Sequence, residues 1–367
     1  MSKYLEILSH FPITEQIVNI KPIGNGHIND TIGITIRTPQ GQDELKYALQ
    51  RINHNVFKDV DTLQKNIFTV TDHIRGKLLR HLDRDVDRHV LTFIRTKEGQ
   101  DYLFLEGTYW RLMRYVSASK SYEGVTPDLA RKAGAAFGNF QAMLADLPQG
   151  AIGETIPHFH DMAFRLEELR EAVRNDAAGR AKEPEVRRLI EEIEKRSEDM
   201  LIQDRLYKEG KLPLRTMHLD TKVNNILFDK YTDEVLCVID LDTVMPGFVT
   251  SDIGDFIRTA VNTGAEDERD LSRIAVNMDI FRAYTEGYLS TAGSFLSPLE
   301  IKLLPYGGRL LTYMQTVRFL TDYINGDVYY KVSSLDHNLV RAKAQYRFLT
   351  CLEEKEEEMD DFVDTLH

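Results

Sequence analysis

The residues with the clearest chemistry lie in one short stretch, His218-Leu219-Asp220-Thr221-Lys222-Val223-Asn224-Asn225, which Asp240 follows fifteen positions later. The stretch reads H-x-D-x-x-x-x-N, and Asp240 closes an I-D pair. Transfer of a phosphoryl group from a nucleotide needs a carboxylate that accepts the proton of the attacking hydroxyl. It also needs an amide oxygen and a second carboxylate that hold Mg²⁺ against the phosphates. Asp220, Asn225 and Asp240 match these roles in order, and His218 is expected to support the loop.

The elements around this stretch predict a hairpin. Two β-prone runs, 226–228 and 235–239, flank a polar turn at 229–234. Because a hairpin returns the chain to its start, Asn225 and Asp240 are expected to lie close together, as ligands of one metal ion must. The alternative is a His-Asp pair that caps a loop, followed by surface acids, and the hairpin with its terminal Asp disfavours it.

The block resembles the catalytic motif of the aminoglycoside phosphotransferase and choline kinase superfamily, whose members share the protein-kinase-like fold. Its wording is most similar to that of the N-acetylhexosamine 1-kinases. The segments that carry the resemblance span nearly the whole chain: 24–29, 49–53, 156–161, 218–242, 245–247, 281–287, 318–320 and 337–341. The resemblance implies a bilobal α+β fold, with an antiparallel, β-rich N-lobe at 1–116. A mainly helical C-lobe at 117–367 would hold the catalytic loop, the metal site and the sugar pocket.

The N-terminal part predicts two strands, at about 17–23 and 31–37, around a loop that contains glycine. Gly24 and Gly26 would let backbone N–H groups approach phosphate oxygens without a Cβ in the way. Taken alone, the loop favours a plain hairpin turn. Ahead of the H-x-D-x-x-x-x-N block, it favours nucleotide binding by Gly24, Gly26 and Asn29.

The next strand, 47–51, aligns with the kinase strand whose lysine contacts the nucleotide phosphates, but Gln50 stands at the lysine position. Arg51 follows, and strand alternation would point it to the opposite face unless a bulge intervenes. No glutamate occurs from Arg51 to Lys97, so the usual Lys–Glu pair lacks its acid too. We therefore expect phosphate charge to be neutralised elsewhere, with Lys222 as a candidate and an exposed loop lysine as the alternative.

Further patterns complete the expected elements. A strand pair at 90–95 and 102–105 should lead into an apolar strand at 109–116. In the implied fold this strand reaches the interlobe hinge, where backbone groups at Tyr115 and Val116 would meet the adenine. Helices are expected at 129–144, at 186–201 behind Pro184, and from a capping box at 297–300.

The resemblance also implies a sugar pocket beside Asp220. Carboxylates and arginines suit vicinal hydroxyls because each offers two hydrogen bonds in a fixed geometry. The positions that match the pattern are His27, Asp242, Thr243, Arg318 and Tyr329. His158 and His160 fit no strong zinc spacing and are interpreted as structural.

Composition limits the alternatives. The 367 residues suffice for two lobes, and no run of about 18 apolar residues predicts a membrane span. A net charge of −12 disfavours nucleic acid as a partner, but it would attract a polycationic aminoglycoside. Two cysteines and the absence of a signal-like start favour a reducing cytoplasm. The sequence leaves the oligomeric state open.

These observations and the resemblance together predict a kinase that uses ATP and Mg²⁺ to phosphorylate the anomeric hydroxyl of an N-acetylhexosamine. Asp220 would accept the proton, and Asn225 and Asp240 would hold the metal. Two alternatives stay open. One is a related kinase that acts on an aminoglycoside, a choline-like amine or homoserine, and the other is a pseudokinase that binds nucleotide without transferring phosphate.

Overall fold

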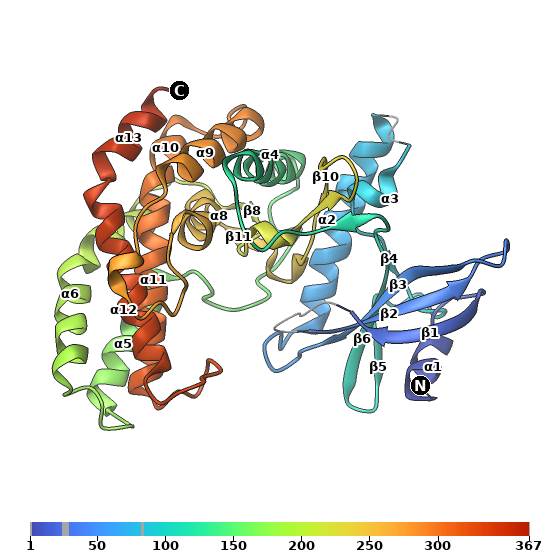
Figure 1. The fold of residues 1–367 in the computed structure, drawn as a ribbon, viewed down its shortest axis with the longest axis horizontal. Coiled ribbons are helices and arrows are strands. Elements are labelled where there is room, and N and C mark those ends of the chain that lie inside the picture. Colours follow the sequence, from blue (N-terminus) through green and yellow to red (C-terminus); the bar gives the residue numbers. More distant parts are fainter. Residues whose placement is uncertain (1, 24–28, 82–83, 367) are drawn as a thin grey trace. The chain divides into compact units, whose positions relative to one another are not determined.

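A computed structural model describes residues 2–23, 29–81 and 84–366, and divides the chain into two compact units. The first unit contains Met1–Tyr122, Met143–Pro157 and Asn224–Pro246. The second contains Glu123–Ala142, His158–Val223 and Gly247–His367. The first is rich in antiparallel strands and the second is mainly helical, which agrees with the expected α+β class (Figure 1).

The first unit is built on an antiparallel sheet whose main path runs β1-β2-β3-β6-β4. Its short strand β5 pairs with β6 as well. The predicted pairing of 90–95 with 102–105 is therefore wrong, because each of these strands uses β6 as its partner. The strands are β1 (Gln16–Pro22), β2 (Asp30–Arg37), β3 (Asp43–Ile52), β4 (Phe93–Ile94), β5 (Leu103–Leu105) and β6 (Thr108–Arg114), and the helices are α1 (Ser2–Ser9), α2 (Val60–Arg80) and α3 (Val86–His89).

Alternation along β2 explains how the sheet is covered. Ile32, Ile34 and Ile36 point to one face, where they are buried against Ile7 and Phe11 in and after α1. The two-residue period of apolar residues thus fixes the register of β2.

The predicted hairpin is present as β9 (Ile226–Asp229) and β10 (Val235–Val238). A third strand, β7 (Ser119–Lys120), pairs with β9 and joins the hairpin to the first unit. An ion pair of 2.8 Å between Arg88 and Asp229 adds to this connection. The compact units consequently differ from the expected division at residue 116, since the hairpin groups with the N-terminal sheet.

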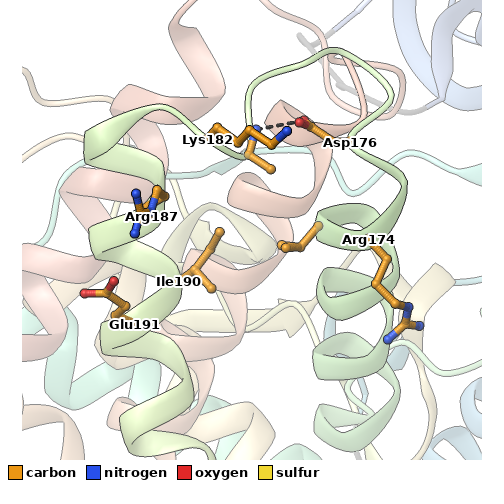
Figure 2. Close-up of a pocket in the computed structure, with 8 residues that line it drawn as sticks. Arg174, Asp176, Lys182, Arg187, Ile190 and Glu191 are labelled. Atoms are coloured by element: carbon orange, nitrogen blue, oxygen red, sulfur yellow. Dashed lines mark hydrogen bonds between the residues drawn. The ribbon is translucent and has the colours of Figure 1, made fainter.

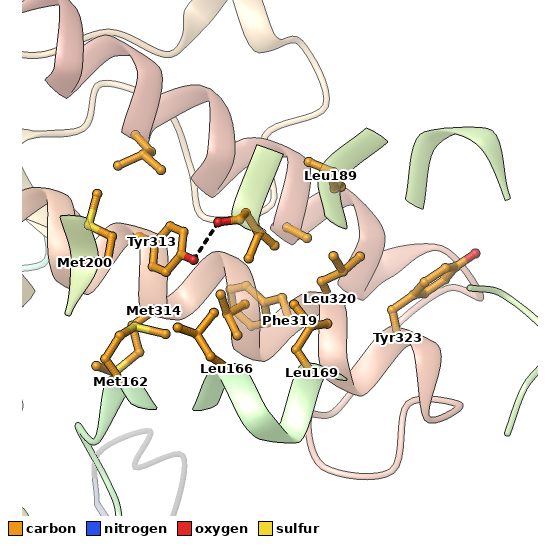
Figure 3. Packing of buried hydrophobic residues seen from close by; sticks show 14 of the residues in the cluster. Met162, Leu166, Leu169, Leu189, Met200, Tyr313, Met314, Phe319, Leu320 and Tyr323 are labelled. Atoms are coloured by element: carbon orange, nitrogen blue, oxygen red, sulfur yellow. Dashed lines mark hydrogen bonds between the residues drawn. The ribbon is translucent and has the colours of Figure 1, made fainter. Parts of the chain in front are cut away.

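The second unit is organised around α11, which is buried on nearly all sides. Its residues Met314, Phe319 and Leu320 pack with Leu166 and Leu169 of α5, and Tyr313 donates a hydrogen bond of 2.8 Å to the carbonyl of Ile193 in α6 (Figure 3). The helices are α4 (Pro127–Leu144), α5 (Met162–Asn175), α6 (Pro184–Met200), α7 (Ile202–Lys208), α8 (Val249–Phe256), α9 (Met278–Ala292), α10 (Pro298–Lys302), α11 (Leu304–Ile324), α12 (His337–Glu354) and α13 (Glu356–Asp364); α4 ends inside the first unit. Short strands β8 (Arg215–Met217) and β11 (Met245–Gly247) flank the catalytic stretch.

Local signals set the starts of two helices as expected. Pro184 is the first residue of α6, and Ser297 and Glu300 form the reciprocal capping box of α10. In the described part of the chain, no helix combines the length and apolar character needed to cross a bilayer.

Candidate active site

The part of the catalytic stretch that lies in the second unit, residues 218–223, is held by Asp252 in α8. One carboxylate oxygen, Oδ1, accepts the backbone N–H of Leu219 at 2.7 Å. The other, Oδ2, accepts the N–H of His218 at 3.0 Å and the side-chain amide of Gln141 at 2.6 Å. Asp252 is completely buried, so water cannot replace these bonds. The loop that carries Asp220 is thereby fixed to the core of the unit.

This fixation holds a strained backbone. Leu219 has a φ of 62°, in the left-handed region that side chains with a Cβ disfavour. The neighbouring imidazole of His218 is buried and lies edge-on to the rings of Phe137 and Phe140, at centroid distances of 5.5 and 5.8 Å. The supporting role expected of His218 stays a prediction. The carboxylate of Asp220 is partly exposed.

Lys222 lies directly against Asp220. Its Nζ is 2.6 Å from Oδ1 of Asp220, and its side chain is 41% exposed. Burial by itself would lower the pKa of Lys222, but the negative charges of Asp220 and Asp255 outweigh it and raise the pKa. Lys222 is therefore a cation at neutral pH and faces the residue expected to accept the proton.

Charged side chains of α8 and the segment that follows it interact with this pair electrostatically. Asp255, one turn after Asp252 in α8, accepts Nη2 of Arg258 at 2.8 Å, and Arg258 also pairs with Glu266 at 3.1 Å. Burial alone would raise the pKa of Asp255, but Arg258 and Lys222 hold it below the usual value. Burial lowers the pKa of nearby His160 to about 3, so that His160 is neutral at pH 7.

Arg318 and Tyr329, both expected in the acceptor pocket, lie together in the second unit. The guanidinium of Arg318 is 5.9 Å from the centre of the Tyr329 ring, 5.7 Å from Tyr330 and 5.5 Å from Phe159. Tyr329 itself is 64% exposed. Its backbone is fixed by buried Asp322, which accepts the N–H groups of residues 328, 329 and 330 at 2.8–2.9 Å.

The expected metal ligands belong to the first unit. The N–H of Ile239 donates to the carbonyl of Asn225 at 2.9 Å, so the hairpin brings Asn225 beside the residue that precedes Asp240. Asp240 is exposed, with a φ of 59° that Asp tolerates better than most residues. In the described ranges, no group of three or more His, Cys, Asp and Glu side chains forms a protein-only metal cage. One carboxylate and one amide oxygen fit Mg²⁺, because that ion completes its shell with phosphates and water.

Several residues that were expected to bind the nucleotide make hydrogen bonds within the first unit. Gln50 Oε1 accepts Nε of Arg111 at 2.8 Å, and no bulge interrupts the pairing of Arg51 with β6. Arg51 donates from Nε to Asp30 at 2.8 Å and is exposed, as strand alternation predicts. The N–H of Tyr115 bonds to the carbonyl of Lys46 at 2.8 Å, and the carbonyl of Val116 accepts the Ser119 hydroxyl at 2.7 Å. The adenine contacts expected at Tyr115 and Val116 stay a prediction.

Asp242 has partners different from those expected for a sugar ligand. Its side chain is 3% exposed; Oδ1 accepts Nη1 of Arg111 at 2.6 Å, and Oδ2 accepts Nδ2 of Asn29 at 2.6 Å. Both oxygens are thus engaged inside the first unit. Thr243 is buried as well. Gly24, Gly26 and His27 lie outside the described residues, so their expected roles stay predictions.

A surface hollow of about 390 Å³ occurs elsewhere in the second unit, between α5 and α6 (Figure 2). None of the candidate catalytic, metal or acceptor residues lines it. Its charged residues carry both signs, and Asp176 is occupied by the backbone N–H of Ala181 at 2.8 Å. The hollow therefore supplies no part of the expected chemistry.

Comparison with known proteins shows the family and the fold of the chain. Residues 20–292 match the model of a family described as the phosphotransferase enzyme family. The chain belongs to this family. Its fold is similar to that of a choline kinase from Cryptosporidium parvum (TM-score 0.58, 13% identity, covering 99% of this chain and 98% of that chain). It is also similar to an aminoglycoside phosphotransferase from Alicyclobacillus acidocaldarius (TM-score 0.53, 14% identity, 96% of each chain).

A third similar structure is a spectinomycin phosphotransferase in complex with ADP and spectinomycin (TM-score 0.52, 12% identity, covering 100% of this chain and 98% of that chain). These likenesses confirm the predicted protein-kinase-like fold. At such identities they do not specify an acceptor.

Sequence reasoning missed two residues that organise the site, Asp252 and Arg111. Asp252 belongs to no motif that the sequence reveals; it shares the mixed segment 248–257 with a second acid, Asp255. Arg111 stands in the apolar strand 109–116, where a buried cation needs a partner. The charge of Arg111 in an apolar strand could therefore have indicated a buried ion pair.

Proposed function

We propose that this phosphotransferase uses ATP and Mg²⁺ to phosphorylate the anomeric hydroxyl of an N-acetylhexosamine. Asp220 accepts the hydroxyl proton, Asn225 and Asp240 hold Mg²⁺, and Lys222 neutralises charge on the transferred group. The observation that carries the phosphoryl-transfer part is the Asp220 carboxylate, paired with Lys222 on a loop that Asp252 fixes. Such positioning is the main contribution a protein makes to this reaction.

The neutral acceptor is supported by Arg318. Proteins that bind quaternary ammonium groups surround them with aromatic rings. Here Phe159, Tyr329 and Tyr330 surround the protein's own guanidinium, which would repel a choline-like amine or a polycation. A sugar hydroxyl or an acetamido carbonyl can instead accept hydrogen bonds from this fixed cation.

The pseudokinase alternative rests on the missing Lys–Glu pair. Against it stand the paired Asp220 and Lys222, since a protein that only bound nucleotide would need neither. Gln50 is bonded to Arg111, which forms an ion pair with Asp242, so a charged pair is still present next to the usual lysine position.

The test is ATP-dependent phosphorylation of a panel of N-acetylhexosamines, hexoses, aminoglycosides, amines and homoserine. The release of ADP measures the reaction. We expect the highest kcat/KM with an N-acetylhexosamine and a product that has lost its reducing end and is acid-labile. A product that still reduces, or turnover confined to amines, would contradict the proposal. ADP release that no acceptor stimulates would contradict it too.

A further inference from the structure

Asp242 and Arg111 form a buried ion pair that nothing in the catalytic motif explains. Both side chains are only 3% exposed, and their closest atoms are 2.6 Å apart. A buried ion pair must recover the cost of removing two charges from water, so it requires further hydrogen bonds. The surroundings supply them: Asn29 donates to Asp242, and Arg111 donates to Gln50.

The pair connects parts of the first unit that are distant in sequence. Asn29 precedes β2, Gln50 lies in β3, Arg111 lies in β6, and Asp242 follows Asp240 by two residues. Gln50 and Arg111 face each other across the ladder, so Arg111 reaches Gln50 with Nε and Asp242 with Nη1. The segment 240–244, which we call the metal loop, is thereby attached to the sheet.

Two more bonds hold the backbone of the metal loop. Thr155 donates to the carbonyl of Asp242 at 2.9 Å, and Asn66 of α2 donates to the carbonyl of Val244 at 2.9 Å. All of these partners belong to the same compact unit. In protein kinases a lysine on the third strand and a glutamate on the following helix form the activating pair. Here Gln50 and the glutamate-free α2 cannot form it.

We infer that the Arg111–Asp242 pair replaces the missing Lys–Glu pair and acts as a positioning device. It holds the metal loop so that the Asp240 carboxylate is set for Mg·ATP, and Asp242 does not contact the acceptor. This inference rests on the proposed function, because it assigns Mg²⁺ to Asp240. It reassigns Asp242 from the sugar pocket to the nucleotide side of the reaction.

The experiment compares Asp242→Asn, Arg111→Lys and the apolar double variant Arg111→Met/Asp242→Leu with wild type. Arg88→Met is the matched control, since Arg88 also makes a first-unit ion pair but does not touch the metal loop. Each protein is measured by thermal unfolding without ligand, by calorimetric titration with Mg·ATP, and by the KM for each substrate. Calorimetry needs no acceptor, so it separates failure of this inference from failure of the proposed acceptor.

We expect Asp242→Asn and Arg111→Lys to weaken Mg·ATP binding about tenfold or more and to raise the Mg²⁺ concentration required, while the acceptor KM changes less than twofold. The double variant leaves no unpaired charge, so although Asn29 and Gln50 each lose a partner, it should unfold no lower than the single variants, and it should keep the weakened binding. Arg88→Met should bind Mg·ATP as wild type does. Recovery of full Mg·ATP affinity in the double variant would show a merely structural pair and overturn the inference. A rise confined to the acceptor KM in Asp242→Asn would also overturn it.

Discussion

Replacing Asp252 by Asn should disable the catalytic loop without touching a reacting atom. The change keeps the shape of the side chain but puts an amide NH₂ where a carboxylate oxygen now accepts hydrogen bonds. Asp252 accepts the N–H groups of His218 and Leu219 and the amide of Gln141, at 2.6–3.0 Å. At least one of these donors would face another donor in the variant.

The magnitude follows from two effects. A buried N–H left without an acceptor costs about 1–3 kcal/mol, and the surviving bonds lose the strength that the charge gives them, so we expect about 2–4 kcal/mol of lost stability. In addition, the left-handed conformation of Leu219 costs about 1–2 kcal/mol, which Asp252 now offsets. Once released, the loop should relax, and the competent conformation should become about ten- to hundredfold rarer.

The assay measures kcat and both KM values by ADP release with the best acceptor of the panel, together with the unfolding temperature. We expect kcat of Asp252→Asn to fall about ten- to hundredfold. The matched control is Asp322→Asn, which removes a buried acid of the same chemistry that holds the segment 328–330 instead. We expect the control to lose similar stability and to raise the acceptor KM, because Asp322 holds Tyr329, but to keep kcat. A kcat for Asp252→Asn within twofold of wild type, at a comparably lowered unfolding temperature, would refute the reasoning.

Three further outcomes are expected. Asp220→Asn should lower kcat by about a thousandfold or more, because the proton acceptor is lost, with calorimetric Mg·ATP affinity nearly unchanged; turnover within a few-fold of wild type would contradict its role. Arg318→Ala should raise the acceptor KM about tenfold and leave the KM for ATP unchanged, whereas a lower KM for amines than for sugars in wild type would show that Arg318 does not exclude cations. Burial lowers the pKa of His160 from 6.5 in the unfolded chain to about 3 in the folded protein. Between these values the unfolded state binds a proton at His160 and the folded state does not. The stability that neutral His160 contributes should therefore be lost as pH falls from about 6.5 towards 3. Urea unfolding of wild type and His160→Leu at pH 7 and pH 5 checks this, and an equal loss in both proteins would contradict it.

Local elements of this protein were predictable because neighbours in sequence specify them. The hairpin β9–β10, the helix α6 behind Pro184 and the capping box of Ser297 and Glu300 each depend on residues a few positions apart. The pairing of β4 and β5 was predicted wrongly for the same reason. Proximity in sequence favoured a hairpin, but β4 pairs with residues 112 and 113 of β6, and β5 pairs with residues 108–110 of the same strand.

The sequence by itself predicted which chemistry is present, because the types and spacing of His218, Asp220, Asn225 and Asp240 match the needs of phosphoryl transfer. Only the tertiary structure decided how these residues are held. Asp252 reaches the catalytic loop from 33 or 34 positions away, and Arg111 and Asn29 reach Asp242 from 131 and 213 positions away. No short-range period encodes such contacts. They follow from packing, in which a buried charge must find a partner wherever the fold brings one within reach.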